Sequence, residues 1–205
     1  MGKDLASSLR PALVMTLLFA VLLGLLYPLA LTGIGQLLFP HQANGSLIEE
    51  NGKVLGSELL AQGFVSDGYF HPRPSAAGKG YDPLFSAGSN LGPASQALHD
   101  RIAGDVKTLK ASVPGSSVPL DLVTASASGL DPDITPEAAL YQVPRVARAR
   151  GLDETRLRAM VEATTAHPLL GFLGEDRVNV LLLNRQLDRA VVNRQLDAVG
   201  ATPSR

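Results

Sequence analysis

Cysteine is absent from all 205 residues of the chain. Disulfides, thiolate metal sites and cysteine nucleophiles are therefore excluded. Histidine is scarce, and no two of the four histidines have the spacing of metal ligands: His41, His71, His99 and His167. We therefore expect no metal centre.

Two common motifs of enzymes are also missing. A phosphate-binding loop requires G-x-x-x-x-G-K-[ST], and the run 78–80 is only a fragment of it, because position 73 is Arg. A serine nucleophile elbow requires Gly-x-Ser-x-Gly, and the nearest run, 125–129, begins with Ala125. The sequence therefore predicts no independent ATP site of this type, and we assign no catalytic residue.

Charge is balanced overall but missing from one long segment. The chain has 18 Lys and Arg against 19 Asp and Glu, and no basic patch stands out, so nucleic acid is not an expected partner. From Pro11 to Ile48 there is no charged residue of either sign. This segment contains an apolar run at residues 12–35.

The run 12–35 predicts a transmembrane helix. Twenty-four helical residues extend about 36 Å, against a hydrocarbon core of about 30 Å. Pro28 falls late in the run and is expected to kink the helix or end its regular part. The alternative is a cleaved signal peptide, but its apolar region is typically about 7–15 residues and ends at a small-x-small site. The longer run and the lack of Ala-x-Ala favour a retained anchor.

The charges that flank the run predict its orientation. Lys3 and Arg10 precede it, and the first basic residue after it is Lys53. The positive-inside rule places the leader 1–11 in the cytoplasm and the domain that follows the run outside. The lipid bilayer is thus an expected partner.

After the anchor we expect a linker at 36–46, one soluble domain at 47–190 and a tail at 191–205. The fold class is α+β, with helices and short strands. Asn51-Gly52 lies between two short apolar runs and indicates a hairpin with a two-residue turn. Residues 66–93 are rich in Gly, Pro, Ser and Asp and predict a long ordered loop, which is more often functional than idle.

The first part of the domain is expected to hold one helix and one strand. Pro93 is predicted as the first helical residue of an amphipathic helix that ends near Pro114. Apolar residues then alternate over 118–124, which indicates a strand, and Pro119 places it at a strand start or an edge.

The second part of the domain is predicted to be helical. Thr135-Pro136 predicts the start of a helix. Pro144 is expected to break that helix near 142–143. Gly151 is expected to end the helical segment. Asp153 is expected to cap the next helix. Residues 178–187 fit either a strand followed by a helix or a single helix, and their spacing favours the helix.

Two features near the C-terminus have open interpretations. Arg145, Arg148 and Arg150 either complement the negative end of a helix or form a docking or anion-contact surface. The sequence NRQLD occurs at 184–188 and again at 193–197. Nine residues turn a helix by about 900°, so the two copies face opposite sides and predict no common binding stripe.

Several blocks of the chain resemble the KdpC family, the C subunits of bacterial Kdp potassium-transporting ATPases. They include LRPALVMTLLFAVLLGLLYPLALTGIGQLLFP, YFHPRPSAAG with YDPLFSAGSNLGP, VTASASGLDPDITPEAALYQVPRVARARGL and VNVLLLNRQLD, in this order. The resemblance implies a non-catalytic accessory subunit in the inner membrane, with the subunits KdpA, KdpB and KdpF as partners. It also implies that the chain acts as a catalytic chaperone, which raises the affinity of KdpB, a P-type ATPase, for ATP.

The resemblance further implies nucleotide contact through residues that match a family segment, here Ser128, Gly129 and Gln142. ATP as a ligand is implied by the resemblance alone. The flanking charges place the domain outside, where it cannot meet cytoplasmic ATP. The two expectations conflict, and coupling through the transmembrane helix would reconcile them.

Gln142 also has an expected structural role. It precedes Val143-Pro144, where the proline removes a backbone donor, and an amide can both donate and accept hydrogen bonds. We expect Gln142 to hold the bend and the loop 128–135 in one arrangement.

The alternative function is a membrane-anchored extracytoplasmic hydrolase or binding protein with a cleft in the loop 66–93. A hydrolase would place a Ser/His/Asp cluster near that loop. A subunit would instead expose an apolar patch and co-purify with larger membrane proteins.

Overall fold

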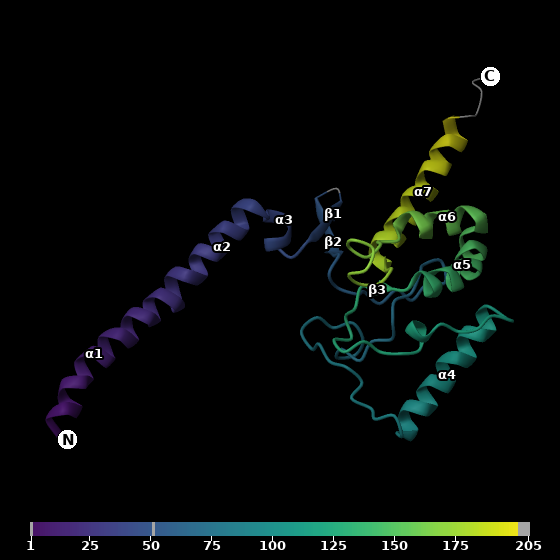
Figure 1. Ribbon diagram of the computed structural model, residues 1–205. Helices are drawn as coiled ribbons and strands as arrows, with labels where there is room; N and C mark the ends of the chain where they lie inside the picture. The colour runs from purple at the N-terminus through teal and green to yellow at the C-terminus, as the bar shows by residue number, and fades with distance from the viewer. Residues whose placement is uncertain (1, 51, 201–205) are drawn as a thin grey trace. The chain divides into compact units, whose positions relative to one another are not determined.

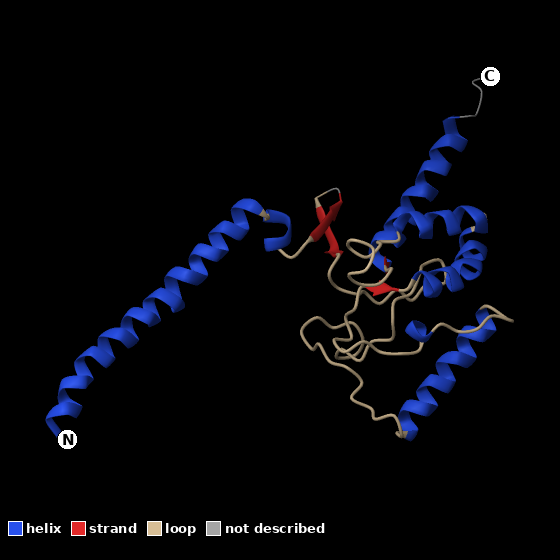
Figure 2. Ribbon diagram, viewed as in Figure 1, coloured by secondary structure: helices blue, strands red, loops and turns tan. Residues whose placement is uncertain are grey.

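The computed structural model describes residues 2–50 and 52–200. The described chain divides into two compact units at the bond between Ser57 and Glu58. The first unit contains one long helix and a hairpin, and the second contains helices and very short strands (Figures 1 and 2). The expected α+β class, with one long apolar N-terminal helix followed by a mixed domain, is confirmed.

The first unit begins with a nearly continuous helical rod. It consists of α1 (Gly2–Val21), the π-helical turn η1 (Leu22–Leu26) and α2 (Tyr27–Leu38). An 18-residue window within Ser7–Leu38 has a mean hydropathy of 2.4, and this stretch is long and apolar enough to cross a membrane. It is longer than the expected span 12–35, and its helical backbone enters the expected linker.

The π-helical turn explains how the helix accommodates Pro28. Proline has no N–H to donate to the residue four positions earlier, Gly24, and its ring crowds that turn. In η1 the backbone widens, so that the N–H of Tyr27 donates to the carbonyl of Leu22, five residues back. The helix therefore continues through Pro28 instead of ending there.

A short helix, α3 (Pro40–Ala43), precedes the hairpin. Strands β1 (Leu47–Glu50) and β2 (Lys53–Ser57) pair antiparallel, with Glu50 opposite Lys53, as the sequence predicts. Gly52 has a φ of +73°, which suits the second position of a tight turn. Asn51, the other predicted turn residue, lies outside the described residues.

The second unit begins with a long irregular segment, which confirms the predicted loop 66–93. Helix α4 (Gln96–Ser112) follows, with Ser95 at its N-cap position, so the prediction of Pro93 as the first helical residue is wrong by three positions. The apolar stripe of α4 is only half-buried, and no residue of this helix is fully buried. The helix ends just before Pro114, as expected.

The predicted strand at 118–124 does not form. The segment contains the 3₁₀ turn η2 (Leu120–Leu122). Leu122 and Val123 are both buried although they are adjacent, whereas Leu120 is exposed. Alternating residues in a strand point to opposite faces, so this burial pattern requires a turn.

Helix α5 (Pro136–Arg150) contributes more residues to the core than any other element. The Thr135 side chain accepts a hydrogen bond from the N–H of Ala138, and Gly151 ends the helix with a φ of +61°, as predicted. The predicted break near 142–143 is wrong, because α5 runs through Pro144 as one helix. Val143 and Val146 are fully buried on either side of the proline, and this packing offsets the cost of about 3 kcal/mol for an interior proline.

Helix α6 (Glu154–Thr164) begins at the predicted cap, where Asp153 accepts from the N–H of Arg156. Two-residue strands β3 (Asp133–Ile134) and β4 (Val178–Asn179) pair antiparallel, and α7 (Val180–Gly200) follows directly. The segment 178–187 is thus a very short strand and then a helix.

The core lies where α5, α6 and α7 meet the strands β3 and β4. Leu157 and Val161 face it from α6, and Leu183 and Leu187 face it from α7. Phe70, from the long loop, is its largest fully buried side chain. Burying such a side chain stabilises the fold by about 1.5–3 kcal/mol, so this residue attaches the loop to the helices.

Candidate functional site

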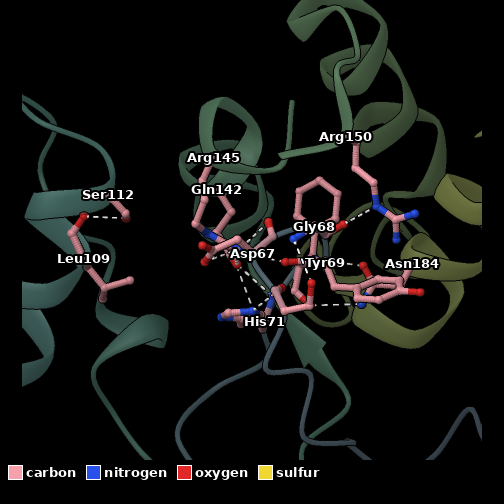
Figure 3. A network of polar contacts seen from close by, with 12 residues as sticks. Asp67, Gly68, Tyr69, His71, Leu109, Ser112, Gln142, Arg145, Arg150 and Asn184 are labelled. Carbon is pink, nitrogen blue, oxygen red and sulfur yellow. Dashed lines mark hydrogen bonds and ion pairs between the residues drawn. The ribbon is translucent and has the colours of Figure 1, made fainter. Parts of the chain in front are cut away.

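A network of polar contacts in the second unit surrounds a loop segment, residues 67–71. This segment belongs to no strand, so its backbone groups need other partners. Side chains of α5 and α7 supply them at five consecutive residues (Figure 3). We call this arrangement the 67–71 clamp.

Two side-chain amides act as substitutes for a neighbouring strand. Asn184 accepts from the N–H of Phe70 at 2.8 Å and donates to its carbonyl at 2.9 Å. Gln142 does the same at His71, with distances of 2.8 Å and 3.0 Å. Both amides are buried, at 2% exposure each. Each amide therefore satisfies both backbone groups of one residue, as a strand would.

Gln142 makes two more hydrogen bonds. Its Nε2 donates to the carbonyl of Ala138 at 3.2 Å, and its Oε1 accepts from Arg145 at 2.7 Å. An amide has two N–H donors and an oxygen with two lone pairs. Both N–H donors and both lone pairs of Gln142 are thus engaged by partners within the protein.

Arginines of α5 complete the clamp. Arg145 donates to the carbonyls of Asp67 at 2.7 Å and Tyr69 at 3.0 Å. Arg150 donates to the carbonyl of Gly68 at 2.8 Å and lies over the Tyr69 ring, 4.4 Å from its centroid. These two arginines thus hold a segment of the chain, an interpretation the sequence reasoning did not consider.

Asp188 of α7 balances the charge of Arg150. Its two carboxylate oxygens accept from Arg150 at 2.8 Å and from the Tyr69 hydroxyl at 3.1 Å. Asn184 and Asp188 belong to the first NRQLD copy and lie four residues apart, on one face of α7. The side chains of the second copy, 193–197, lie outside the described residues.

Burial changes the acid–base behaviour of the clamp. Desolvation lowers the pKa of His71, and the nearby positive charge of Arg145 lowers it further, against the opposing effects of the Ser66 carbonyl and Asp67. The same desolvation lowers the pKa of Arg145, which Asp67 partly offsets. The His71 ring therefore favours its neutral form, with Nε2 3.0 Å from the carbonyl of Ser66.

Ser128 and Gly129 lie in a different place from Gln142. The Ser128 carbonyl accepts from the N–H of Ala87 at 3.0 Å, and the Gly129 carbonyl accepts from the Ser75 hydroxyl at 2.6 Å. Both residues therefore hold the loop that precedes α4. Their hydrogen bonds do not join them to Gln142.

Two surface hollows reflect the same separation. Ser128 lines one of about 740 Å³, and Gln142 lines another of about 250 Å³ together with His71. The expected contact of Gln142 with the loop 128–135 is wrong. The glutamine holds residue 71 instead, because the side of α5 that carries it faces the 67–71 segment.

The described residues contain no group of three or more His, Cys, Asp or Glu side chains arranged to hold a metal. The His99–Asp100 and His167–Asp176 pairs are exposed at the surface. The arrangement at 67–71 is a structural clamp, and its chemistry is that of holding a loop against helices.

Comparison with known proteins places the chain in a family. The family described as "K+-transporting ATPase, c chain" (KdpC) matches residues 9–189, which include most of the apolar helix and most of the second unit. A protein of Caulobacter vibrioides strain NA1000, named potassium-transporting ATPase KdpC subunit, is 57% identical over 89% of this chain and 93% of its own length.

Two further relatives carry the same name. The Rhodopseudomonas palustris strain BisB18 protein is 55% identical over 89% of this chain and 98% of its own length. The Bradyrhizobium diazoefficiens protein is 54% identical over 89% and 96% respectively. The resemblance inferred from the residues is therefore confirmed, and the chain belongs to the KdpC family of potassium-transporting ATPase subunits.

Proposed function

We propose that this chain is a non-catalytic accessory subunit of an ATP-driven potassium pump in the bacterial inner membrane. The observation that carries the proposal is the family match, which extends over the apolar helix and the domain together. In this role the chain assembles with a channel-like subunit, a P-type ATPase subunit and a small fourth subunit, which the family resemblance names KdpA, KdpB and KdpF.

The described structure supports a scaffolding role. The 67–71 clamp uses side chains of α5 and α7 to fix a loop, and every polar group of the Gln142 amide is bound within the protein. Gln142 therefore has no free donor or acceptor for a nucleotide unless the clamp breaks. We therefore propose that the residues matched to nucleotide contact, including Ser128 and Gly129, hold loops.

Modulation of ATP use then requires a connection across the membrane. None of the most apolar part of the helix Ser7–Leu38 is buried within the described chain, so neighbouring helices and lipid can contact it. Gly24, Gly33 and Gly35 leave open space around the backbone, which permits close approach of a partner helix. We propose that this helix docks in the pump and transmits the effect of the domain on ATP use.

We expect the second unit to lie outside the cytoplasm, since Lys3 and Arg10 precede the apolar helix and the next basic residue is Lys53. Alkaline phosphatase, which is active only outside, should be active when it is fused after Ser46 or at the C-terminus. A cytoplasmic reporter at the same sites should be inactive and serves as the control. Inactive phosphatase at both sites, with active cytoplasmic reporters, would refute this orientation.

A further inference from the structure

The segment between α6 and β4 exposes a cluster of large apolar side chains. Leu169, Leu170, Phe172 and Leu173 are 70%, 75%, 72% and 53% exposed. No charged residue occurs from 168 to 174. Single exposed apolar residues are normal on proteins, whereas a contiguous group marks an interaction surface. We call residues 168–174 the apolar knob.

The tip of the knob is a closed turn. The N–H of Gly171 donates to the carbonyl of Pro168 at 3.0 Å, and the N–H of Leu173 donates to the carbonyl of Leu169 at 3.0 Å. Leu170 has a φ of +57°, an uncommon conformation for leucine, and its side chain is exposed. The exposed apolar side chains are thus carried by a turn whose backbone is held by hydrogen bonds.

The base of the knob is joined to the core. Ala166 and Arg177 exchange two backbone hydrogen bonds, at 2.8 Å and 3.0 Å. The next residue, Val178, is fully buried and pairs with Ile134 in the β3–β4 sheet. The knob therefore projects from a fixed platform, which lowers the entropy cost of binding.

An acidic hollow adjoins the knob. Its volume is about 370 Å³, and its lining contains five carboxylates and two guanidinium groups. Arg73 pairs with Asp131 at 3.1 Å and Arg177 pairs with Asp133 at 3.2 Å, which leaves an excess of negative charge. Glu175, directly after the knob, is exposed and contributes to this excess.

The charge of the hollow decides what kind of partner fits the knob. Elements that insert into a bilayer surface typically carry Lys and Arg beside their apolar residues, because many membrane lipids are anionic. This knob is bordered by carboxylates, which disfavour such a surface. A protein with an apolar socket and basic side chains at its rim is complementary in both respects.

We propose that the apolar knob docks into an apolar socket on another subunit of the same complex, and that a lysine or arginine at the rim of the socket enters the acidic hollow. This inference rests on the proposed function, since it takes the partner to be a subunit of the pump. To the proposed function, this inference adds which surface of the domain binds the partner subunit and which chemical groups that subunit presents.

The first test measures assembly with full-length chains co-expressed with the other subunits and purified through a tag on this chain. Replacing Leu169 and Phe172 together by Ser should lower the co-purified subunits by about tenfold, because buried apolar anchors dominate binding. The matched control replaces Leu84 and Phe85, which are 83% and 65% exposed elsewhere, and should change nothing.

A separate variant tests how much the negative charge of the acidic hollow contributes to binding. Glu175→Lys should lower co-purification by about threefold and weaken the dependence of assembly on salt. Glu162→Lys, at an exposed position of α6, is the control and should assemble normally. Wild-type yields for both the knob and the Glu175 variants would overturn the inference. If the wild-type chain recovers no pump subunit, the proposed function itself fails.

A second measurement separates a protein socket from lipid. The chain has no tryptophan, so Phe172→Trp introduces a single fluorescent reporter at the knob. In nanodiscs, the emission that the variant complex shows in excess of the wild-type complex supports the socket if it is blue-shifted and brominated lipid does not quench it. Quenching by brominated lipid would place the knob in the bilayer and overturn the inference.

Discussion

Gln142→Ala should lower the stability of the full chain in detergent by about 3 kcal/mol. Truncation removes four hydrogen bonds and leaves the part-buried backbone N–H and carbonyl of His71 without the Gln142 amide, while Arg145 keeps its bonds to the carbonyls of Asp67 and Tyr69. Each unsatisfied buried group costs about 1–3 kcal/mol, and partial rearrangement recovers some of that cost. For a domain of this size the melting temperature should fall by about 8 °C. Thermal melting followed by circular dichroism measures it.

The matched control is Gln96→Ala, at an exposed position of α4. It should change stability by less than about 0.5 kcal/mol. The Gln142→Ala complex should transport potassium less well only in proportion to its poorer assembly. Unchanged melting together with a raised ATP requirement in the intact pump would instead support direct nucleotide contact by Gln142.

Gly129→Ala should cost about 4 kcal/mol, the sum of an overpacking term and a backbone-strain term. A Cβ at Gly129 would lie 2.6 Å from the carbonyl oxygen of Ala87 and 2.7 Å from the amide nitrogen of Ala77. Both contacts are with backbone, so no side-chain rotation relieves them. The Gly129 φ of +67° adds strain for any residue with a side chain.

The control variant Gly115→Ala measures the cost of backbone strain without overpacking. Gly115 has a φ of +84°, but a Cβ there would have nothing within 4 Å. This control should cost only about 1 kcal/mol. Protease cleavage within 77–87 should increase in the Gly129 variant and stay at the wild-type level in the control. Equal melting temperatures for the two variants would show that close packing at Gly129 contributes nothing.

Local signals made several elements predictable. The caps at Thr135 and Asp153 and the left-handed end at Gly151 depend on residues within four positions, and the structure has all three. The apolar run was visible for the same reason, since hydropathy requires no partner. Its helix extends to Leu38 because backbone hydrogen bonding continues past the polar Gln36 through Leu37 and Leu38.

Predictions that depended on distant packing were wrong. The alternation at 118–124 resembles a strand, but the adjacent Leu122 and Val123 are both drawn into buried positions. Pro144 predicts a break when α5 is considered alone. Core contacts of Val143 and Val146 hold the helix together, and the sequence does not show them.

The clamp was only partly predictable. Gln142 was expected to hold a loop through its amide, but its partner His71 is 71 residues away along the chain. Asn184 was not singled out at all, although its position between Val180 and Leu187 on the apolar face of α7 was a usable signal. A polar residue on such a face needs a buried partner.

The central claim, that this chain is a subunit of a potassium pump, is tested most directly by purification from native membranes. A tag at the C-terminus of the full chain should recover a P-type ATPase subunit and a channel-like subunit after mild detergent extraction, and the preparation should hydrolyse ATP faster when potassium is added. Recovery of the chain alone, from membranes in which the pump is present and active, would contradict the account.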